Sequence, residues 1–83
     1  MKFIAEINVM PHKALLDPQG KTVSAAMKNL NLSEISNVRI GKHIQLELEA
    51  VSDSEARKMV EQACSELLAN PIMEGFTFEL EAV

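Results

Sequence analysis

Residues 15–23 read Leu-Leu-Asp-Pro-Gln-Gly-Lys-Thr-Val and join the first strand pattern of the chain to its first helix pattern. Asp17 is suited to the N-cap, because its carboxylate accepts hydrogen bonds from unpaired amides and favours the helix dipole. Pro18 suits the first helical position, where a missing N–H costs nothing. The stretch therefore predicts a helix to about Leu30. Its apolar stripe, at i, i+3, i+4 and i+7, is made by Val23, Ala26, Met27 and Leu30.

The end of this stretch, Gly20-Lys21-Thr22, resembles the end of a nucleotide-binding phosphate loop. The complete motif requires a glycine five residues before Gly20, and position 15 is leucine. The preceding loop also contains a proline and two leucines. The spacing therefore favours a capped helix start over a phosphate site.

Alternation of apolar and polar residues predicts four strands. The first covers residues 2–10 and is expected to end at Pro11, which cannot donate to a ladder. Residues 38–40 and 44–49 alternate on either side of Gly41-Lys42-His43, which predicts a hairpin with a turn at 41–43. The fourth covers residues 76–81, where Phe76, Phe78 and Leu80 alternate with polar residues.

A second helix is predicted after Ser52-Asp53-Ser54-Glu55, which matches a capping box. It is expected to run to about Ala69, because Asn70-Pro71 stops it. Its predicted buried stripe consists of Ala56, Met59, Val60, Ala63, Cys64 and Leu67.

The order strand, helix, strand, strand, helix, strand is the split βαβ pattern. It predicts an α+β fold, a ferredoxin-like βαββαβ sandwich with a four-stranded antiparallel sheet and both helices on one face. The expected spatial order of strands is fourth, first, third, second. At 83 residues the chain is expected to be a single domain over positions 1–83.

Composition excludes several classes of function. The net charge of −4 disfavours a nucleic-acid binder, which needs a basic face. No apolar run approaches the ~18 residues of a membrane span, and the N-terminus lacks the apolar core of a signal peptide. A single cysteine, Cys64, cannot form an internal disulfide. We therefore expect a cytoplasmic protein.

Candidate chemistry is sparse. His12 and His43 both fall in predicted turns, and neither lies in a pattern of three or four metal ligands. Five carboxylates alternate onto the sheet face away from the helices, where an open surface offers no burial to raise a pKa for acid–base catalysis. This acidic face has two interpretations, a solvated surface or a docking surface. Its members are Glu6, Glu47, Glu49, Glu79 and Glu81.

Three stretches together resemble one family: Leu16-Asp17-Pro18-Gln19-Gly20-Lys21-Thr22-Val23, Val38-Arg39-Ile40-Gly41-Lys42, and Leu67-Leu68-Ala69-Asn70-Pro71-Ile72-Met73-Glu74. With the length and element order, they resemble PurS, the small subunit of phosphoribosylformylglycinamidine (FGAM) synthase. Gly75 departs from the family pattern, in which a polar residue is more usual.

The resemblance implies a role in purine biosynthesis without catalytic residues. The family's enzyme converts formylglycinamide ribonucleotide, glutamine and ATP into formylglycinamidine ribonucleotide. PurS-like subunits form dimers or tetramers and bridge a glutaminase subunit and a large synthetase subunit. Ammonia must pass between those sites without reaching water. The chain itself is expected to bind no cofactor, whereas the complex uses ATP and Mg²⁺.

Residues at the ends of elements in these stretches are the candidate subunit contacts. Gly20 is notable because a glycine weakens a first helical turn, so we expect its backbone to pass close to another chain. The candidates are Leu15, Leu16, Asp17, Gln19, Gly20, Arg39, Lys42, Asn70 and Glu74.

Rival functions of similar topology lack their defining residues. A ligand-binding regulatory domain of the ACT type needs a glycine-rich loop after the first strand, where this chain has Pro11-His12-Lys13. An acylphosphatase-like hydrolase needs an arginine near the first loop. An RNA-binding domain of the RRM type needs exposed aromatics and basic charge.

Overall fold

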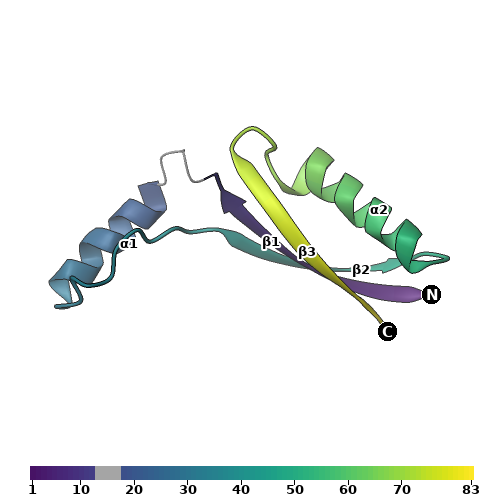
Figure 1. The fold of residues 1–83 in the computed structure, drawn as a ribbon, viewed down its shortest axis with the longest axis horizontal. Coiled ribbons are helices and arrows are strands. Elements are labelled where there is room, and N and C mark those ends of the chain that lie inside the picture. Colours follow the sequence, from purple (N-terminus) through teal and green to yellow (C-terminus); the bar gives the residue numbers. More distant parts are fainter. Residues whose placement is uncertain (13–17) are drawn as a thin grey trace.

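The structure is a computed structural model that describes residues 1–12 and 18–83, so Leu15, Leu16 and the predicted cap Asp17 lie outside the described residues. The elements are, in order, β1 (Lys2–Pro11), α1 (Pro18–Asn29), β2 (Lys42–Glu49), α2 (Asp53–Ala63), the π-helical turn η1 (Cys64–Leu68) and β3 (Glu74–Ala82) (Figure 1). The predicted α+β class, with two helices and an antiparallel sheet, is confirmed.

The sheet of the described chain has three strands in the order β2-β1-β3. Both pairings are antiparallel, with Ile7 opposite Ile44 on one side and Phe78 on the other. The predicted neighbours of the first strand are therefore confirmed. The predicted second strand is wrong, because residues 38–40 belong to no strand within residues 1–12 and 18–83, whereas the predicted strand at residues 76–81 is confirmed as part of β3.

The predicted hairpin turn at 41–43 is also wrong. β2 begins at Lys42, opposite Val9, and the chain before it is extended rather than folded back. A Cβ at Gly41 would overlap the carbonyl oxygen of Val9 and the side chain of Met10. Gly41 thus lets the backbone run closely past the end of β1, and residues 38–40 continue beyond the sheet instead of pairing along β2.

The core lies between one face of the sheet and α2. Phe3, Ala5, Ile7 and Val9 of β1 are fully buried on this inner face, as the alternation predicted. They pack in two clusters with Ala56, Val60 and Cys64 of the helix. The predicted N-cap is confirmed, since Ser52 Oγ accepts a hydrogen bond from the backbone N–H of Glu55 at 3.2 Å.

The last turn of this helix differs from the predicted pattern. The N–H of Ala69 donates to the carbonyl of Cys64 at 2.9 Å, an i→i+5 bond that closes the π-turn. The extra residue in this turn rotates the side chains that follow. Leu68 instead of the predicted Leu67 packs against the core, and Leu67 is 82% exposed. Met59, also predicted in the stripe, is exposed as well.

α1 does not cover the sheet, so the prediction of two helices on one face is wrong for the single chain. Figure 1 shows α1 and the extended segment that returns from it as an arm projecting beyond the sheet. The radius of gyration is 16.4 Å, against about 12 Å for a compact domain of this length. We call residues 18–41 the arm.

The arm leaves much of its apolar surface in solvent. In the predicted stripe of α1, Val23 and Met27 are half-buried, Ala26 is exposed and Leu30 is 66% exposed. The helix ends as helices commonly do, because Asn31 adopts a left-handed φ of 60° and Leu32 N–H bonds back to Met27 O at 2.9 Å. Within the described part of the chain, no helix has the length and apolar character needed to cross a membrane.

Candidate functional site

The outer face of the sheet carries the five predicted carboxylates together. Glu6 lies directly opposite Glu79 across β1 and β3, and Ile4 lies between Glu47 and Glu81. Glu49 is the register partner of Lys2. Like charges opposite each other on adjacent strands repel, so this arrangement needs compensation.

Three neighbouring groups provide that compensation. Lys2 Nζ forms an ion pair with Glu47 Oε1 at 3.2 Å. Gln45 Nε2 donates to Glu6 Oε1 at 2.7 Å, and His43 Nε2 lies 3.3 Å from Glu6 Oε2. The hydrogen bond from Gln45, followed by that from His43, lowers the pKa of the Glu6 carboxyl below its ordinary value.

His43 belongs to β2 and not to a turn. Its Nδ1 lies 2.7 Å from Asn8 Oδ1, so the ring bridges Asn8 and Glu6. This network was not predicted from the sequence, because His43 was assigned to a turn. Extending the alternation of residues 44–49 by two residues places His43 on the outer face. Among residues 1–12 and 18–83, no three His, Cys, Asp or Glu side chains lie close enough to share a metal ion.

A second feature is the turn between η1 and β3, which contains two candidate contacts. Asn70 N–H donates to Glu74 Oε1 at 2.9 Å, and Asn70 Oδ1 accepts from Ile72 N–H at 3.0 Å. His12 N–H also donates to Met73 O at 2.9 Å, which ties the turn to the end of β1. Asn70 and Glu74 therefore shape this turn locally.

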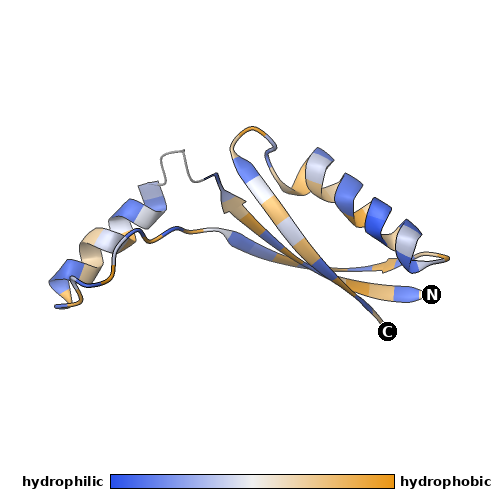
Figure 2. Cartoon of the chain, in the orientation of Figure 1, coloured by the Kyte–Doolittle hydropathy of each residue, from blue (hydrophilic) through white to orange (hydrophobic). Residues whose placement is uncertain are grey.

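The turn holds large apolar side chains in solvent. Ile72 is 83% exposed and Met73 52% exposed, and the ribbon of this turn has the hydrophobic colour in Figure 2. Ile72 and Met73 were not among the residues predicted to make contacts, although both lie in the family-like stretch 67–74. Their hydrophobicity after a helix-stopping proline was the available signal.

The first turn of α1 contains the candidates Gln19 and Gly20. Gly20 is buried within the chain itself, so its burial does not require a second chain. Gln19 lines a shallow groove of about 480 Å³ with Val23 of α1 and Ile40 of the returning segment. Ser24 Oγ accepts from Val38 N–H at 3.2 Å, which fixes the two parts of the arm to each other.

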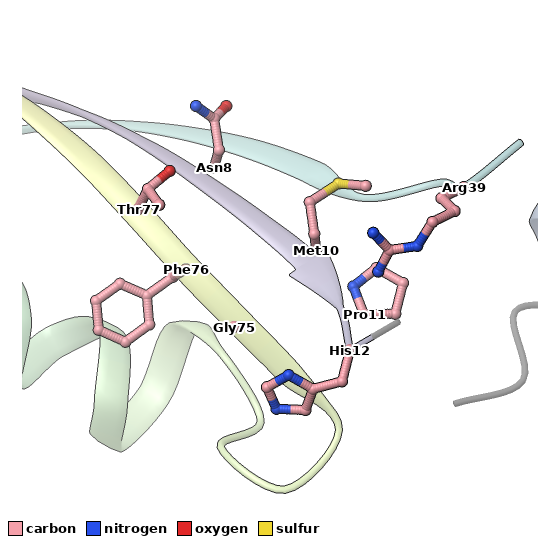
Figure 3. Close-up of a pocket in the computed structure, with 8 residues that line it drawn as sticks. All are labelled: Asn8, Met10, Pro11, His12, Arg39, Gly75, Phe76 and Thr77. Atoms are coloured by element: carbon pink, nitrogen blue, oxygen red, sulfur yellow. The ribbon is translucent and has the colours of Figure 1, made fainter. Parts of the chain in front are cut away.

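Arg39 lies where the arm meets the sheet, at a different place from Gln19 and Gly20. It lines a hollow of about 310 Å³ on the outer face, together with residues from the ends of β1 and β3 (Figure 3). Lys42, the remaining described candidate, starts β2 and is exposed. The structure thus distributes the candidates over three regions, namely the arm, the junction and the turn before β3.

Comparison with known proteins gives a consistent result. The sequence model of PurS, described as phosphoribosylformylglycinamidine (FGAM) synthase, matches residues 4–82. The chain is 38% identical over 77 residues to phosphoribosylformylglycinamidine synthase subunit PurS of Synechocystis sp., covering 93% of this chain and 77% of that protein.

Solved structures agree. PurS of Bacillus subtilis superposes with a TM-score of 0.87 at 34% identity, over 96% of this chain and 99% of that one. A chain of PurLQS from Thermotoga maritima superposes with a TM-score of 0.88 at 31% identity, over 98% and 99%. These similarities do not favour the ACT-like alternative. The chain belongs to the PurS family of phosphoribosylformylglycinamidine synthase subunits.

Proposed function

We propose that the chain is the non-catalytic, accessory subunit of a cytoplasmic FGAM synthase, and that it acts as a dimer or larger assembly. In this proposal it bridges a glutaminase subunit and a large synthetase subunit, and supports ammonia transfer between them. ATP and Mg²⁺ are used by the complex and are not held by this chain. The PurLQS complex from Thermotoga maritima, in which a similar chain occurs, supports the assembly with other subunits.

The proposed self-association rests on the exposed apolar side chains of the arm. A helix with an apolar stripe is stable in water when that stripe is packed. Here α1 lies off its own sheet, with Ala26 and Leu30 exposed. Leu32 and Ile35, in the segment that follows, are exposed as well.

The inner face of the sheet has apolar surface that its own chain does not fully cover. One helix, α2, covers this face. Apolar side chains of the two edge strands are only half-buried there, namely Ile44 and Leu46 on β2 and Phe76 and Phe78 on β3. A sandwich of this class normally has two helices on that face. The α1 helix of a second copy would complete it, and the exchange would be reciprocal in a two-fold dimer.

Charge supports the same pairing. The arm, residues 18–41, contains three basic side chains and one acidic one, whereas residues 1–12 and 42–83 contain four basic and ten acidic ones. An arm with a net positive charge is therefore attracted to the body of a neighbouring copy, which carries a net negative charge.

The proposed role is tested by reconstitution with purified glutaminase and synthetase subunits. The chain alone should show neither glutaminase nor ATPase turnover, and adding it to the two partners should restore glutamine-dependent FGAM formation. Turnover by the pure chain, or unchanged glutamine-dependent activity when it is omitted, would contradict the proposal. With ammonium chloride in place of glutamine, the synthetase should depend less on the chain.

A further inference from the structure

The hollow at the junction of the arm and the sheet has no role in the assembly described above. It lies on the outer face, where Asn8 and Met10 of β1 are opposite Thr77 and Gly75 of β3. Arg39 approaches from the extended segment of the arm (Figure 3). At about 310 Å³, its volume is near the lower end for small-molecule sites, which span roughly 300–1,000 Å³.

The described polar side chains around the hollow can donate hydrogen bonds, and none of them carries a negative charge. Among the described residues, no Asp or Glu lines it, although five carboxylates occupy the same face of the sheet. The guanidinium of Arg39 has no hydrogen-bond or ion-pair partner within the described residues, yet the residue is half-buried. Asn8 receives the His43 ring on its Oδ1 and retains its Nδ2 donors.

Gly75 keeps the hollow open. A Cβ at this position would lie 3.5 Å from His12 Cε1, which is ordinary van der Waals contact. A larger residue therefore fits the backbone and would occupy part of the hollow beside His12. The glycine is thus not required by a close approach of the chain, in contrast to Gly41.

We propose that this hollow binds a small ligand that presents an oxyanion, a carboxylate or a phosphate, beside a short apolar part. Arg39 pairs with the oxyanion, since a guanidinium offers paired N–H donors that match both groups. Asn8 and Thr77 supply further donors, and Met10 and Pro11 contact the apolar part. The proposal does not depend on the role of the chain in FGAM synthesis.

The test is a titration of the full-length, ¹⁵N-labelled chain with acetate, butyrate and inorganic phosphate, followed by NMR at constant ionic strength. Saturable shifts should appear at the amides of residues 8, 39 and 75–77. Arg39→Gln should weaken binding by about tenfold or more, because a charge-assisted bond is lost. The matched control Lys28→Gln, which removes a positive charge at the far end of α1, should leave it unchanged.

A second variant fills the space instead of removing the charge. Gly75→Val should keep the dispersed spectrum of a folded chain and abolish the saturable shifts. Tighter binding of butyrate than of phosphate would support a carboxylate ligand, and the reverse would support a phosphorylated one. Absence of saturable shifts with all three anions, or equal binding by Arg39→Gln and Lys28→Gln, would overturn the proposal.

Discussion

Gly41 packs so closely on the carbonyl oxygen of Val9 that the position has no room for a side chain. This contact sets the point at which the chain leaves the sheet to form the arm. A substitution here must displace backbone, which is more costly than moving the end of a flexible side chain.

The first prediction follows from that contact. Gly41→Ala should lower the free energy of unfolding by about 2–3 kcal/mol, since overpacking against backbone costs this much. The matched control is Gly75→Ala, whose Cβ has 3.5 Å of clearance and should change stability little. Urea denaturation of the wild-type chain and of the two variants, at equal protein concentration, measures both changes in unfolding free energy. A smaller loss for Gly41→Ala than for Gly75→Ala would contradict the path assigned to the arm.

The second prediction concerns the π-turn. Leu68→Ala should cost about 2–3 kcal/mol of stability, because Leu68 packs against the core. Leu67→Ala should change it by no more than about 0.5 kcal/mol, because Leu67 is exposed. Thermal or urea unfolding of both variants checks the ranking. The opposite order would mean that the helix continues as a regular α-helix through residue 68.

The third prediction is a pH dependence. Hydrogen bonds from Gln45 and then His43 lower the pKa of Glu6 below its ordinary 4.5. The carboxylate therefore contributes stability above about pH 4.5, and this contribution is lost as the pH falls through the lowered pKa. Glu6→Gln should reduce the fall in unfolding free energy over this acidic range.

Glu49→Gln is the matched control for this pH series, because it removes a carboxylate of the same face without a bond to Gln45 or His43. It should retain the wild-type dependence. If Glu6→Gln and the wild-type chain lose stability in parallel between pH 5 and pH 3, the network around Glu6 has no such role.

The fourth prediction tests the stripe of α1. Ala26→Glu places a charge on the stripe, whereas Ala25→Glu places the same charge on the opposite side of the helix. Both residues are exposed in the single chain, so neither change should unfold it. Ala26→Glu should weaken self-association in sedimentation velocity by at least about tenfold, and Ala25→Glu should leave it near wild type. Equal effects would indicate that the stripe is not an interface.

Local sequence patterns predicted the elements whose partners lie within this chain. Alternation in β1 identified the buried side chains of Phe3, Ala5, Ile7 and Val9. The predicted cap at Ser52 was correct because capping depends only on residues 52–55. The five carboxylates of the outer face followed from the same period of two.

The failures have a common physical origin in interactions that are not local. Residues 38–40 have the alternation of a strand but no adjacent strand in the described chain, and periodicity does not reveal whether a partner exists. The apolar stripe of α1 likewise does not reveal whether the helix packs on the sheet of its own chain or on that of a second copy. The hollow depends on Arg39, Asn8 and Gly75, which are distant in sequence. The register of β1 and β3 brings Asn8 and Gly75 together, and the path of the arm brings Arg39 beside them (Figure 3).

The exchange of arms is tested most directly by isotope-filtered NMR on an equal mixture of labelled and unlabelled chain, mixed under denaturing conditions and refolded. The account predicts intermolecular NOEs from the methyl groups of Val23 and Met27 in one copy to inner-face side chains of the other, at Ile44, Leu46, Phe76 or Phe78. A chain that remains monomeric at micromolar concentration, or contacts of α1 that are all intramolecular, would contradict it.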